Sequence, residues 1–72
     1  MKTELEKKLN KLPEYIELNK VKFCLDIGKY KENDILMWCI SYIDYCDNIL
    51  FSVQHQSLQA AVDTMLSEIK KL

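Results

Sequence analysis

The side chains best suited to chemistry in this chain are three cysteines and a single histidine. Cys24, Cys39, Cys46 and His55 make a Cys₃His set, and zinc binds such a set tetrahedrally. No two of them have the CxxC spacing of a zinc knuckle, and Cys24 and Cys39 fall within predicted strands. We therefore expect no metal and no cofactor, and we interpret the thiols as small buried or half-buried side chains.

Cys46 and His55 could also act together as a nucleophile and its base. The sequence suggests no third residue that would orient His55 and no oxyanion loop beside Cys46. The plainer interpretation of His55 is a polar residue that precedes a helix cap. We expect a protein that is not an enzyme, and a small Cys/His enzyme is the weaker alternative.

A third cluster places two carboxylates around a tyrosine, with Asp44 and Asp47 flanking Tyr45 shortly after Tyr42. Such carboxylates could bind Mg²⁺ or do acid–base work, but Asp also favours plain solvated turns between strands. Tyrosines beside acidic groups also suit a protein-binding tip, because Tyr offers a large contact area at a small entropy cost. The plain turn and the binding tip stay open, and the tip would use Tyr42, Asp44, Tyr45 and Asp47. One of the two tyrosines should point outward.

Helical patterns at the two ends of the chain enclose the segments that must position these residues. Thr3 can cap a first helix over 3–12, and Pro13 stops it. Ser57 can cap a final helix over 57–72, which carries a broad apolar stripe. Between them, strands are predicted over 15–18, 21–27, 35–43 and 49–54.

The turns of the predicted sheet follow from residue type. Asn19 tolerates a positive φ, so Asn19 and Lys20 fit a two-residue hairpin turn. Gly28 is predicted to end the strand over 21–27, and a polar turn that holds Tyr30 is predicted over 29–34. Asp and Asn predict another turn over 44–48.

Together these patterns predict one small α+β domain over 1–72. An antiparallel sheet of three to four strands carries an N-terminal and a C-terminal helix packed on one face (α-β-β-β-β-α). The core is expected to contain Val21, Phe23, Leu25, Trp38, Ile40, Phe51, Val53, Leu58, Val62, Met65 and Ile69.

The strand over 35–43 is apolar on both sides, so we predict that it lies inside the sheet. The sheet face away from the helices would then be too apolar for comfortable exposure. We expect a second copy of the chain or another protein to cover it, and Met37 and Leu50 join the candidate partner-binding residues. The predicted face carries Cys24, Met37, Cys39, Ser41 and Leu50.

Composition disfavours nucleic acid and membranes as partners. The net charge is −1, and all ten basic residues are Lys, so the chain lacks the side chain best suited to bidentate phosphate contacts. The longest apolar run, 35–40, is far too short to span a bilayer. Three cysteines without close pairing favour a reducing, cytoplasmic setting.

The function that these observations favour is a small non-enzymatic protein-binding module. The Lys-, Asn- and Ile-rich composition without Arg suggests AT-rich coding, as in many phages and mobile elements. We expect an accessory protein that inhibits a host bacterial enzyme or defence complex by contact, by analogy with such proteins.

The alternative is an antitoxin or regulatory subunit that dimerises and sequesters a toxin. In element order alone, the chain resembles double-stranded-RNA-binding domains and small HicB-type antitoxin domains. The RNA-binding family begins its last helix with basic residues, whereas this chain has His55, Gln56 and Ser57 there.

Overall fold

The computed structural model describes residues 3–72, so the first two residues of the domain predicted over 1–72 lie outside it. Its elements follow one another as α-β-β-β-β-α, which confirms the predicted fold class. They are α1 (Glu4–Leu9), β1 (Tyr15–Leu18), β2 (Val21–Glu32), β3 (Ile35–Ile43), β4 (Ile49–His55) and α2 (Leu58–Lys70).

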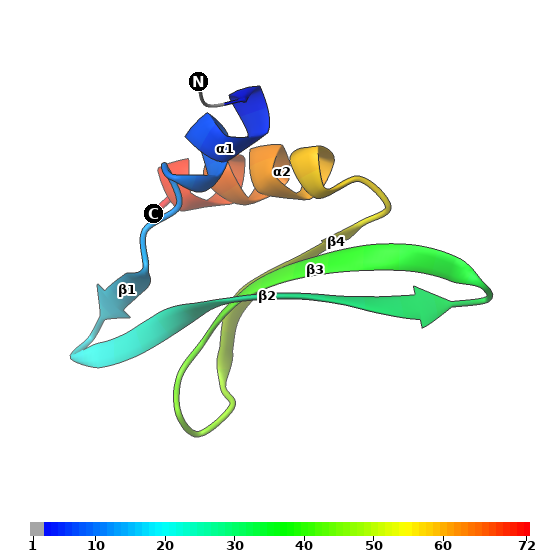
Figure 1. Ribbon diagram of the computed structural model, residues 1–72. Helices are drawn as coiled ribbons and strands as arrows, with labels where there is room; N and C mark the ends of the chain where they lie inside the picture. The colour runs from blue at the N-terminus through cyan, green and yellow to red at the C-terminus, as the bar shows by residue number, and fades with distance from the viewer. Residues whose placement is uncertain (1–2) are drawn as a thin grey trace.

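The four strands form one antiparallel sheet in the order β1-β2-β3-β4. Both helices lie on the same side of this curled sheet, as predicted (Figure 1). We call that side the helix face and the other side the open face. β3 lies inside the sheet, as its two apolar sides predict, and the short β1 pairs with only the first part of β2.

Two tight turns set the lengths of the strands. Asn19 and Lys20 have φ values of 51° and 67°, which confirms the predicted hairpin turn. The prediction that Gly28 ends a strand is wrong, because Gly28 pairs with Cys39 and β2 continues to Glu32. Asn33 and Asp34 make the turn instead, with φ values of 52° and 65°.

The helix caps are those that the sequence predicts, but the helices are shorter. Thr3 Oγ1 accepts a hydrogen bond from Glu6 N at 3.1 Å, and Ser57 Oγ accepts one from Ala60 N at 3.3 Å. α1 ends at Leu9 rather than at residue 12, because the chain then tightens and Leu12 N donates to Leu9 O at 3.1 Å. This turn brings Leu12 into the core.

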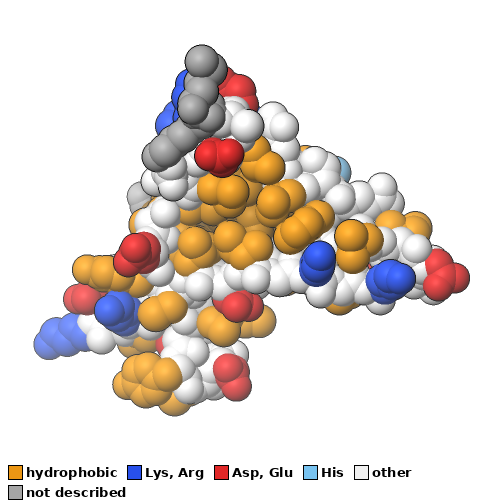
Figure 2. Space-filling model, viewed as in Figure 1, with side chains coloured by type: hydrophobic (Ala, Val, Ile, Leu, Met, Phe, Trp, Pro, Cys, Tyr) orange, Lys and Arg blue, Asp and Glu red, His pale blue; other side chains and the backbone are white. Residues whose placement is uncertain are grey.

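The core lies between the helices and the helix face of β3 and β4. Its buried residues are Leu12, Ile40, Tyr42, Val53, Ala61, Val62 and Met65. Phe23, Leu25, Phe51, Leu58 and Ile69 pack against them only partly buried, and hydrophobic side chains remain visible between the helices and β2 (Figure 2). So small a domain leaves part of its core at the surface.

Val21 and Trp38 are the errors in the predicted core. Val21 is exposed at the Asn19-Lys20 turn. Trp38 is half-buried outside the core cluster, and Lys29 Nζ lies 5.5 Å from the centroid of its ring. Val21 lies next to the first turn, and Trp38 pairs with His55, the last residue of β4, beyond which the β2–β3 hairpin runs on past the helices (Figure 1).

Candidate protein-interaction surface

The candidate site is built on the open face, which neither of the two helices covers (Figure 1). Residues paired across neighbouring strands share a face, so the sheet register identifies one apolar row that crosses all four strands. Ile49 and Tyr15, at the two ends of this row, keep 61% and 50% of their surface exposed. The row consists of Tyr15, Cys24, Ile43 and Ile49.

Next to this row the open face becomes polar. Ser41 Oγ and Ser52 Oγ lie 3.1 Å apart, and Cys39 Sγ lies 3.4 Å from Ser41 Oγ. Further along the sheet, Tyr30 donates a hydrogen bond to Gln54 Oε1 at 2.9 Å. These contacts satisfy the hydroxyl groups of Tyr30, Ser41 and Ser52, so the apolar row is the part of the face with most to gain from burial.

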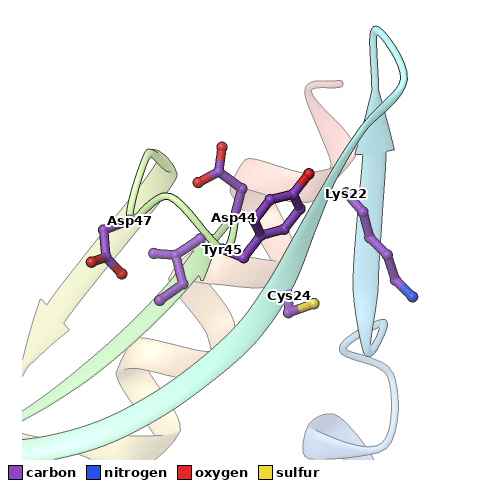
Figure 3. A pocket seen from close by; sticks show the side chains of 6 residues that line it. Lys22, Cys24, Asp44, Tyr45 and Asp47 are labelled. Carbon is purple, nitrogen blue, oxygen red and sulfur yellow. The ribbon is translucent and has the colours of Figure 1, made fainter.

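An open cavity of about 410 Å³ lies against the middle of the row, where the loop 44–48 meets β2. Figure 3 shows Tyr45 reaching over β2 near Cys24, while Asp47 lies on the far side of the loop. The floor is apolar and charged groups stand around it, so the cavity suits a side chain with an apolar stem. Its lining residues are Lys22, Cys24, Ile43, Asp44, Tyr45 and Asp47.

Asp44 holds this loop together instead of offering its carboxylate to a partner. It is only 8% exposed, and its Oδ1 accepts hydrogen bonds from Cys46 N at 2.8 Å and Asn48 N at 2.9 Å. The Asn48 side-chain amide donates to Oδ2 at 3.0 Å. These bonds, led by that amide, hold the pKa of Asp44 below its usual value. Asp44 is therefore a structural residue of the site.

Tyr42 and Tyr45 have opposite environments. Tyr45 is 94% exposed, which confirms that one of the two tyrosines points outward. Tyr42 was a candidate contact residue, but its side chain is fully buried and its hydroxyl donates to Pro13 O at 2.7 Å. Within the loop 44–48, Tyr45 and Asp47 therefore remain as the exposed contact candidates.

The other two predicted contact residues lie away from this cavity. Met37 is on the open face, opposite Tyr30 and half-buried. Leu50 packs against the core, so its predicted place on the open face is wrong. The pairing of β3 with β4 shifts between Tyr42 and Ile43, and this bulge places Leu50 out of the alternation that the sequence shows.

The cysteines and His55 are not brought together. Cys46 lies in the loop that precedes β4, whereas His55 ends β4, and its Nδ1 accepts a hydrogen bond from Ser57 N at 3.1 Å. All three cysteines are free thiols. Among residues 3–72, no group of three or more His, Cys, Asp or Glu side chains is placed to hold a metal ion.

The sequence did not identify four residues of the site, which are Tyr15, Lys22, Ile43 and Ile49. Lys22 Nζ lies 4.2 Å from the centroid of the Tyr15 ring, so a cation lies beside the β1 end of the apolar row. These residues belong to the site because the strand register places them on the open face, and a single sequence specifies that register only weakly. The period-two pattern that places Cys24 on the open face was the one available signal.

No protein-family model, no curated protein and no solved structure matches this chain. In the part of the chain that the structure describes, neither helix is long and apolar enough to cross a membrane.

Proposed function

We propose that this chain is a small non-enzymatic protein-binding module that acts by contact through the open face and the loop 44–48. The observation that carries the proposal is the 94% exposure of Tyr45 beside an apolar row that no helix covers. Large apolar patches on a small domain commonly mark interaction sites, and Tyr is among the side chains that contribute most to interfaces.

The chemistry of the site indicates the kind of partner surface that fits. The cavity would take an apolar side chain against Cys24 and Ile43, while Tyr45 covers it from the loop side. Asp47 is exposed, and its carboxylate forms no ion pair with any of residues 3–72, so it can pair with a cation. A partner surface with Lys or Arg around a hydrophobic projection would suit this arrangement and would bind in a salt-sensitive way.

The biological setting is also part of the proposal. The amino-acid composition without Arg, which suggests AT-rich coding, supports a phage or mobile-element accessory protein. Such a protein would work in the bacterial cytoplasm and inhibit a host enzyme or defence complex. Two copies of the chain that pair would offer the open face twice, so a homo-oligomer fits the same role. An antitoxin that sequesters a small nuclease is the second candidate, because an exposed apolar face would serve it equally.

The test compares partner capture by the parent chain and by the double variant Tyr45→Ala with Asp47→Asn. Asn is used because Asp47 has a φ of 63°, which Asn tolerates and Ala does not. Removing the exposed ring and the charge should weaken binding by about 2 kcal/mol, or roughly 30-fold, with little change in melting temperature.

Leu36→Ala is the matched control, because Leu36 is also an exposed apolar residue but lies outside the open face. A bacterial protein captured by the parent and by this control, and lost with the double variant, supports the proposal. Equal binding by all three proteins would place the interface elsewhere. Capture of a small toxic nuclease would favour the antitoxin alternative.

A further inference from the structure

The outer edge of β4 is the least protected strand edge of this fold. β4 ends the sheet, and its seven residues, ILFSVQH, include neither a charged residue nor a proline. Proteins usually protect such edges with charges, proline or short strands, because an open edge pairs with other chains. At the opposite edge, β1 has only four residues, and the part of β2 beyond it carries Lys29, Lys31 and Glu32.

The ladder shows which backbone groups of β4 point away from the sheet. Leu25 N donates to Glu14 O, so odd-numbered residues of β2 direct their N–H and C=O groups toward the β1 side. Because these directions alternate along a strand, even-numbered residues of β2 bond to β3. Across β3 and into residues 51–55 of β4, where the pairing is regular, the same alternation leaves the backbone groups of Ser52 and Gln54 pointing outward.

The bulge near Leu50 limits where a second strand can pair. Only the regular segment from residue 51 to residue 55 presents a straight edge, and Val53 is its centre. A two-fold axis at Val53 places Ser52 of one copy opposite Gln54 of the other, so that the outward groups of both residues are hydrogen-bonded. An axis at Ser52 would instead require the bulged Leu50 to pair with Gln54.

We propose that β4 pairs antiparallel with β4 of a second copy of this chain, around an axis at Val53. The two four-stranded sheets then become one continuous sheet with all helices on one side. A second copy is the occupant that fits, because the edge is self-complementary in this register and has no charge that would select a different strand. With a net charge of only −1 per chain, repulsion between copies is small.

This pairing would join the two open faces side by side, since Ser52 and Gln54 both point their side chains to that face. α2 packs over the helix face of β3 and β4, so it lies to one side of the plane in which a second strand would pair.

The experiment measures mass and amide exchange on the full chain. Sedimentation should give twice the mass of one chain for the parent and for Gln54→Ala. Gln54→Pro should be monomeric or dimerise at least tenfold more weakly. Both variants lose the hydrogen bond from Tyr30, but only proline removes the outward N–H, a change that an isolated edge strand tolerates. Circular dichroism checks that each variant is folded.

Residue-resolved hydrogen exchange of the parent tests the register even if Gln54→Pro fails to fold. The amides of Ser52 and Gln54 should become protected as concentration rises, whereas those of Phe51 and Val53, bonded within the sheet, should be protected at every concentration. A parent that stays monomeric at the highest concentration reached would overturn the proposal. So would a dimer in which the Ser52 and Gln54 amides exchange freely. Neither result would bear on partner binding through Tyr45.

Discussion

Tyr42 connects two segments that are far apart in the sequence. Its ring is buried in the core and meets Phe51 edge-on, with the ring centroids 5.7 Å apart at an angle of 78°. Its hydroxyl reaches the carbonyl of Pro13, in the segment that links α1 to β1. A buried tyrosine needs such an acceptor, so this one residue both fills the core and ties the N-terminal segment to β3.

Replacing Tyr42 with Phe should destabilise the domain by about 1 kcal/mol at neutral pH, because the hydrogen bond to Pro13 is lost. Burial raises the pKa of Tyr42 from 10.0 to about 12. Unfolding therefore releases a proton in that range, so the contribution of Tyr42 is complete below pH 10 and is lost as the pH rises toward 12.

Urea unfolding of the parent and of Tyr42→Phe, at neutral pH and between pH 10 and 12, checks this expectation. The difference in free energy of unfolding between the two proteins should shrink over the alkaline range. A difference that stays constant or grows there would show that Tyr42 does not retain its proton in the folded state.

The β2–β3 hairpin is the element that the turn residues shape most. Asn33 and Asp34 both adopt positive φ, and this two-residue turn reverses the chain between the twelve-residue strand β2 and the strand β3. The hairpin extends past the end of β4, because Trp38 is the first residue of β3 that pairs with β4, and its partner His55 is the last residue of β4. The tip is therefore a two-stranded ribbon, and Ile35 and Leu36 in it are exposed.

The first hairpin offers a direct test of turn geometry. Lys20 has a φ of 67°, where a side chain is strained, so Lys20→Gly should create an Asn-Gly type I′ turn. We expect the free energy of unfolding to rise by about 0.5–1 kcal/mol in urea titrations. Lys31→Gly is the control, because Lys31 lies in regular strand and glycine there should destabilise the sheet. Destabilisation by both changes would argue against this turn.

At the scale of the whole molecule, the domain measures 37 × 34 × 20 Å, and its core has one helix layer on one sheet. Few side chains are completely buried, so partly buried residues such as Phe51 carry a large share of the stability. The same arrangement leaves the open face without a covering layer. Stability is thus supplied by one side of the sheet, and the other side is available for contacts.

Phe51→Ala should therefore cost about 3 kcal/mol, a large fraction of what so small a core supplies. The ring packs against the core and against Tyr42, and the alanine would leave that contact empty. Urea unfolding followed by Trp38 fluorescence measures the change. Ile27→Ala, at an exposed position of β2, should cost less than about 1 kcal/mol, and a similar loss for both variants would contradict the assigned core.

The sequence by itself determined the fold class, the order of the elements, both helix caps and the Asn19-Lys20 turn. These features depend on contacts a few residues apart: hydroxyls of Thr3 and Ser57 that accept nearby N–H groups, and alternation along each strand. The prediction that one of Tyr42 and Tyr45 points outward followed in the same way. Local chemistry was sufficient for each of them.

Only the tertiary structure decided which residues belong to the surface and which to the core. Tyr42 is buried with its hydroxyl bonded to Pro13 O, Leu50 turns to the core because of a bulge, and Gly28 continues a strand. The apolar row of the open face depends on the register between strands, which sets neighbours that are distant in the sequence. Those pairings are fixed by packing across the whole sheet, and no short stretch of the chain contains them.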